Sequence, residues 1–112
     1  MDRINSYRAY ITELVNYYAG IKPANGDFDM QAVTDREHDH YQVVLVGWDR
    51  NNRRVHDCIM HIDIKNDKIW IQANTTDIDI ANKLVERGVP KDDIVLAFHP
   101  PYKRPYTGFA VN

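Results

Sequence analysis

The chain has 112 residues, of which 44% are hydrophobic and 27% charged, and its formal net charge is −2 at pH 7. This length predicts a single domain, residues 1–112, with one hydrophobic core. The slight negative charge argues against a protein whose main surface binds DNA, so we expect any DNA contact to be indirect or weak. No segment reaches the roughly 20 apolar residues of a membrane span, and no secretory signal precedes the domain. Cys58 is the only cysteine, which excludes an internal disulfide and favours a cytoplasmic location.

The first predicted element is a helix over residues 4–18. Its apolar residues recur at three- and four-residue steps and form one stripe. They are Ile4, Tyr7, Ile11, Leu14, Val15 and Tyr18. Gly20 and Pro23 are expected to end this helix, and an Asn-Gly turn is predicted at residues 24–27.

Four strands are predicted next, over residues 30–35, 41–48, 54–65 and 68–72. The first alternates weakly, as an edge strand does. The second is apolar on both sides, which predicts a central strand covered on both faces. In the third, strict alternation assigns Val55, Asp57, Ile59, His61 and Asp63 to one face and His56, Cys58, Met60, Ile62 and Ile64 to the other.

A second helix is predicted after Thr76, which we expect to be its N-cap, with Asp79 as a weak form of the capping-box acid. Gly88 and Pro90 should end it, and an apolar strand at residues 94–98 should then be buried. The order α-β-β-β-β-α-β predicts an α+β fold. It would have a mainly antiparallel sheet of about five strands, two helices and an extended C-terminal segment.

The C-terminal segment, residues 98–112, combines aromatic, basic and proline residues. Proline fixes φ and removes backbone donors, so we expect this segment to be stiff and not helical. Such a segment either lies across its own domain or presents a surface to a partner. Because Tyr, Trp and Arg are enriched at protein interfaces, it yields candidate partner-binding residues. These are Tyr102, Lys103, Arg104 and Tyr106, together with Trp48 and Trp70.

The histidines and the cysteine do not form a recognisable site in the sequence. The tight ligand spacings of structural zinc sites do not occur, so no metal site and no cofactor are predicted. A thiol–imidazole pair of Cys58 with His56 or His61 is another candidate, but a mid-strand cysteine with apolar neighbours should be a buried hydrophobe. No catalytic motif is present, and the chain is predicted not to be an enzyme.

Several segments resemble the XisI family, the fdxN-element excision controlling factors of cyanobacteria. They span residues 47–49, 61–65, 68–72, 88–102 and 107–111. The resemblance implies an accessory protein required for programmed excision of a DNA element during heterocyst development, with a separate recombinase. It also implies a neighbouring XisH protein with a nuclease-type fold. The family name reports a genetic requirement and assigns no catalytic residues.

Three functions follow as hypotheses. The first is a non-enzymatic controlling factor that binds another protein, the XisH-like one, through the C-terminal segment. The second is a DNA-binding accessory factor that uses the basic residues at 50–54 and 103–104. The third is a metal-dependent hydrolase or nuclease with Asp57, His61 and Asp63 on one sheet face. Exposed sheet edges also permit a homo-oligomer.

Overall fold

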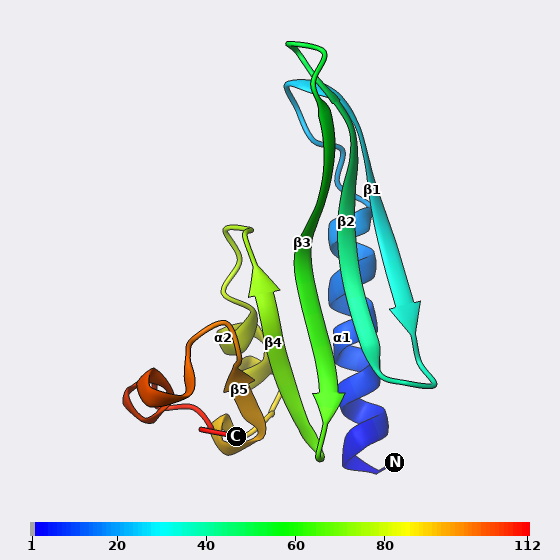
Figure 1. The fold of residues 1–112 in the computed structure, drawn as a ribbon. Coiled ribbons are helices and arrows are strands. Elements are labelled where there is room, and N and C mark those ends of the chain that lie inside the picture. Colours follow the sequence, from blue (N-terminus) through cyan, green and yellow to red (C-terminus); the bar gives the residue numbers. More distant parts are fainter. Residues whose placement is uncertain (1) are drawn as a thin grey trace.

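Figure 1 shows the fold of residues 2–112, described by a computed structural model, as a sheet with both α-helices packed on one face. The sheet has five strands. The elements are α1 (Arg3–Ala19), β1 (Gly26–Asp35), β2 (His40–Asp49), β3 (Arg54–Lys65), β4 (Lys68–Asn74), α2 (Ile80–Glu86), the 3-10 helix η1 (Lys91–Asp93), β5 (Ile94–Leu96) and the 3-10 helix η2 (Pro101–Tyr106). The strands lie in chain order from β1 to β5, and only the β4–β5 pair is parallel. The predicted α+β class is therefore confirmed.

One core fills the space between the helices and the sheet. The stripe of α1 buries Tyr7, Ile11 and Val15 against the sheet, where α1 packs on β1, β2 and β3, as the helical spacing predicts. From the sheet and α2 the core takes Tyr41, Val43, Met60, Ile62, Ile69, Ile71, Ile80 and Leu84. Burying each such side chain stabilises the fold by roughly 1.5–3 kcal/mol. None of the helices within residues 2–112 is long and apolar enough to cross a membrane.

The prediction that the strand at residues 41–48 is covered on both faces is wrong. This strand is β2, an interior strand that pairs with β1 and β3, and α1 covers only one of its faces. We call the opposite side of the sheet the open face. On β2, Val44 and Val46 point to this face and are half-buried, whereas Trp48 is exposed.

The predicted alternation of β3 is also wrong in its first half, because the strand contains a β-bulge. Val43 pairs with Met60 but Val44 pairs with Cys58, so Ile59 has no partner on β2. The extra residue reverses the faces of the residues that precede it. Met60 and Ile62 are buried as expected, whereas Cys58 is exposed and is not the buried hydrophobe that alternation predicts.

Three other boundaries differ from the predictions. The N-cap of α2 is Asp79, whose carboxylate accepts the Asn82 amide, while Thr76 lies in the preceding turn. β1 begins at Gly26, inside the predicted turn. β5 ends at Leu96, because the chain turns there and the amide of His99 donates to the Leu96 carbonyl.

A polar network fixes α1 to the β1–β2 turn. Both oxygens of Asp39 accept hydrogen bonds from the Arg8 guanidinium at 2.8 and 3.0 Å, and the Tyr41 hydroxyl donates to Asp39 at 3.0 Å. The hydrogen bond from Arg8 is the main reason that the pKa of Asp39 is lowered. Burial, helped by the hydrogen bond to Asp39, raises the pKa of Tyr41 to about 12.

We predict that Asp39→Asn lowers the free energy of unfolding at pH 7 by about 1–2 kcal/mol, the difference between charged and neutral hydrogen bonds. Asparagine tolerates the φ of 58° at this position, so the substitution leaves the backbone in place and removes the charge and one of the two acceptor oxygens. A carboxyl group whose pKa is lowered by folding stabilises above its unfolded pKa of about 3.9 and loses this contribution as the pH falls through its folded pKa. The gap between wild type and variant should therefore close below about pH 4 in urea unfolding.

The matched control is Asp67→Asn. Asp67 has a similar φ of 63° but lies exposed in the β3–β4 turn. It should change stability by less than about 0.5 kcal/mol at either pH. An equal effect of the two substitutions at pH 7 would contradict the prediction.

Candidate functional site

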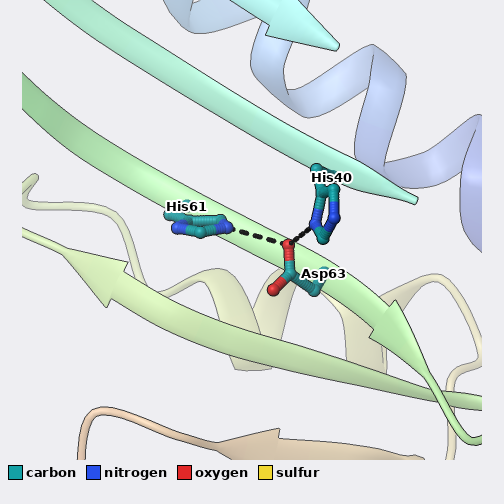
Figure 2. Close-up of side chains that lie close together, drawn as sticks. All are labelled: His40, His61 and Asp63. Atoms are coloured by element: carbon teal, nitrogen blue, oxygen red, sulfur yellow. Dashed lines mark hydrogen bonds and ion pairs between the residues drawn. The ribbon is translucent and has the colours of Figure 1, made fainter. Parts of the chain in front are cut away.

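A cluster of two histidines and one aspartate lies on the open face, near one end of the sheet (Figure 2). His40 is the first residue of β2 and pairs across the strands with Asp63 of β3. His61 lies two residues before Asp63, so alternation points both side chains to the same face. The intervening residues Tyr41 and Ile62 are buried in the core on the other side. We call these three residues the His–Asp–His cluster.

One carboxylate oxygen holds the cluster together. His40 Nδ1 and His61 Nε2 each lie 2.8 Å from Oδ1 of Asp63, as the dashed lines in Figure 2 mark. The other oxygen, Oδ2, accepts a hydrogen bond of 3.2 Å from the Gln72 amide. The side chain of Asp63 is 14% exposed, against 28% for His61 and 55% for His40. The hydrogen bond to Asp63 raises the pKa of His40.

The surroundings of the cluster leave it accessible from solvent. An open hollow beside the two imidazoles is lined by Val33, Asp35, His40, Gln42 and His61. Asp35 pairs across the strands with His40 and also binds His38 at 2.8 Å. This hydrogen bond is the main cause of the lowered pKa of Asp35. Two imidazoles and a carboxylate beside an open hollow can bind a cation or exchange protons with solvent.

The sequence grouping of Asp57, His61 and Asp63 is only partly correct. His61 and Asp63 do lie together, but the bulge at Ile59 turns Asp57 to the opposite face, where it pairs with Leu45. His40 takes the third position, although its sequence neighbours gave no indication of this. Its pairing with Asp63 depends on the strand register.

The C-terminal segment is not extended as predicted, because residues 101–106 form the 3-10 helix η2. Pro101 occupies the first turn, where a missing N–H costs nothing, and the turn is too short for Pro105 to break it. Beyond η2, Ala110 forms a parallel bridge with Val95. The segment therefore covers the β5 edge of its own sheet.

Arg104 links η2 to the rest of the domain through hydrogen bonds and a ring contact. Its guanidinium donates to the carbonyl oxygens of His99 at 3.0 Å and of Ala97 and Val111 at 3.4 Å. It also lies 5.6 Å from the ring centre of Trp70. Tyr102 and Tyr106 of the same turn remain 72% and 87% exposed. Lys103 is exposed beside Tyr102.

The two tryptophans have different environments. Trp48 is 49% exposed at the end of β2, under the Arg54 guanidinium. Trp70 is only 8% exposed, since its indole N–H donates to the Lys65 carbonyl and its ring packs with Val95 and Ala110. The candidate partner-binding surface therefore excludes Trp70, which is buried, and Arg104, whose guanidinium is bound to backbone carbonyls of its own chain.

Comparisons with known proteins give one consistent result. The sequence profile described as "XisI protein" matches residues 1–111. A crystal structure of a XisI-like protein from Anabaena variabilis is 40% identical, with a TM-score of 0.89, and covers 98% of this chain and 100% of its own. The fdxN element excision controlling factor XisI from the same organism is 32% identical, with a TM-score of 0.85 and coverage of 99% and 100%. The search of curated proteins gives no match. The chain belongs to the XisI family.

Proposed function

We propose that this protein is a non-enzymatic accessory factor for programmed DNA excision that acts by binding another protein, the XisH-like one. The similarity to an excision controlling factor supports the process. The observation that carries the binding role is the exposure of Tyr102 and Tyr106 on a turn that Arg104 holds in place.

A rigid, exposed aromatic turn is well suited to binding. Tyrosine supplies a large contact area, and a backbone already held in a short helix loses little conformational freedom on association. η2 is closed by its own hydrogen bonds, from the Lys103 amide to the Pro100 carbonyl and from the Thr107 amide to the Arg104 carbonyl. Lys103 adds one positive charge, which favours an acidic partner surface.

The non-enzymatic role is supported by the environment of Cys58. Its Sγ lies 3.3 Å from the Met60 carbonyl oxygen, to which the thiol donates. A catalytic thiolate instead needs a base or a positive charge at its sulfur.

A DNA-binding factor is the alternative, and the tip of the β2–β3 hairpin favours it. Arg50, Arg53 and Arg54 lie at or beside this turn, which projects beyond α1 in Figure 1. Arg54, however, stacks on Trp48. The carboxylate of Asp49 accepts hydrogen bonds from the backbone amides of Asn51 and Arg53 and so closes the turn. Binding through these arginines would weaken steeply as the salt concentration rises, whereas binding through the tyrosines would not.

We predict that the double substitution Tyr102→Ala and Tyr106→Ala weakens binding to the XisH-like protein at least roughly 100-fold, as expected for two interface tyrosines. Because both side chains are exposed, the free energy of unfolding should change by less than about 0.5 kcal/mol. Calorimetric titration of the two purified proteins and urea unfolding give these values.

Tyr17→Ala is the control, because Tyr17 is a tyrosine on α1 with 66% exposure, outside η2. It should bind the partner like the wild type. Unchanged affinity of the double variant would exclude the tyrosine surface, and an unfolded double variant would show that these side chains stabilise the domain.

A further inference from the structure

We propose that His40, His61 and Asp63 form a binding site for a divalent transition-metal ion, with Zn²⁺ as the representative ion. The donor set decides the class of metal. Imidazole nitrogens suit zinc and its neighbours, whereas Mg²⁺ and Ca²⁺ prefer sites made of oxygen ligands. Two histidines and one carboxylate are a known three-residue zinc set that leaves a fourth position open.

The three ligand atoms are already close to a metal-binding arrangement. His40 Nδ1, His61 Nε2 and a carboxylate oxygen of Asp63 lie within 4.8 Å of one another. Zinc–ligand distances of about 2.0–2.2 Å in a tetrahedral site place neighbouring ligand atoms roughly 3.3 Å apart. The 2.8 Å contacts between each nitrogen and Asp63 Oδ1 would therefore need to lengthen by about 0.5 Å, and the two nitrogens would need to take the same spacing of roughly 3.3 Å from each other. Each nitrogen that now faces the carboxylate would face the ion instead.

The scaffold holds these ligands in place. All three project from paired β-strands and not from loops, which limits their movement. Gln72 is the unpaired residue of a second β-bulge, between Ile71 and Ala73 of β4. The bulge residue's amide donates to Asp63 Oδ2, the oxygen that faces away from the histidines. Hydrogen bonds of this kind orient a metal-binding carboxylate.

The fourth position faces the open hollow that Val33, Asp35 and Gln42 line. A water molecule or a side chain of a bound protein can complete the coordination there. Asp35 is the acidic residue that pairs with His40 on the neighbouring strand, and its carboxylate already shares a hydrogen bond with His38. The site is therefore an exposed three-ligand site, suited to a reversible ion.

Calorimetric titration of the full chain with ZnCl₂, in buffer freed of metal with a chelator, tests the proposal. The wild type should bind one Zn²⁺ per chain with saturation. Since loss of a supporting hydrogen bond alone weakens known sites by about 10–100-fold, His61→Ala and Asp63→Ala should weaken binding at least roughly 100-fold and Gln72→Ala about tenfold. Zinc should also raise the unfolding temperature of the wild type but not of His61→Ala.

His56→Ala and Cys58→Ser are matched controls, because both residues are exposed on β3 outside the cluster and could hold zinc adventitiously. Each should bind zinc within about twofold of the wild type. The proposal is overturned if the wild type shows no saturable binding, if His61→Ala binds equally well, or if Cys58→Ser abolishes binding. Circular dichroism in chelator verifies that each variant is folded before its affinity is interpreted.

Discussion

Gly47→Ala is expected to destabilise the protein by at least about 3 kcal/mol, through a backbone clash between β1 and β2. A Cβ atom on Gly47 would lie 2.1 Å from the Asp27 carbonyl oxygen and 2.8 Å from Cα of Phe28. Both are backbone atoms, so no side chain can rotate away, and the two strands would have to separate. Gly47 also has a φ of 156°, which alanine adopts poorly. Urea unfolding measures the loss.

Gly20→Ala is the control for this substitution. Gly20 has a φ of −81°, and its nearest neighbour to a new Cβ is the Tyr17 carbonyl oxygen at 3.4 Å. Alanine there should leave stability unchanged or increase it by up to about 1 kcal/mol. If Gly47→Ala kept the stability of the wild type, the close approach of β1 to β2 at this residue would be incorrect.

Arg104→Ala is expected to release the C-terminal segment and to lower stability by about 2 kcal/mol. The side chain donates to the carbonyl oxygens of residues 97, 99 and 111 and lies over Trp70, so its loss removes the contacts that hold η2 to the chain before and after it and to β4. Limited proteolysis should then cut within residues 98–112. In a Trp48→Phe background, the fluorescence of Trp70 should move to longer wavelength as water reaches it.

Lys103→Ala provides the comparison, since Lys103 is the adjacent basic residue. Its ammonium group lies 6.0 Å from the ring centre of the exposed Tyr102. This substitution should leave proteolysis, fluorescence and stability unchanged. Equal protease resistance of the Arg104 variant would show that Ala110 and its bridge to Val95 hold the segment without Arg104. The two sets of substitutions thus test different properties. Replacing Tyr102 and Tyr106 tests partner binding, whereas replacing Arg104 tests the stability of the C-terminal segment.

Local sequence patterns predicted most of the elements. The apolar stripe of residues 4–18, the glycine at 88 and the alternation of residues 60–65 each reflect contacts or backbone angles set within a few residues. The N-cap of α2 was misplaced by three residues because Thr76 and Asp79 are both suitable caps. The choice between them depends on where Ile80 and Leu84 meet the core.

The His–Asp–His cluster illustrates what local patterns miss. Trp48 pairs with Arg54, and a hairpin continued without a bulge from that pair would place His40 opposite Ile62. The extra residue at Ile59 shifts the register by one, which brings His40 opposite Asp63 instead. Its backbone is accommodated because the Thr75 amide donates to the Ile59 carbonyl. No feature of residues 54–65 read alone indicates this contact.

The sequence by itself determined the fold class, the order of the helices and strands and the XisI family, because periodicity and family motifs are carried by neighbouring residues. Only the tertiary structure decided three further points. They are the open face of β2, the exposure of Cys58 and the split of the C-terminal segment into a fixed Arg104 and two exposed tyrosines. The physical reason is shared: burial and register depend on which distant strands pair, and a single bulge changes both.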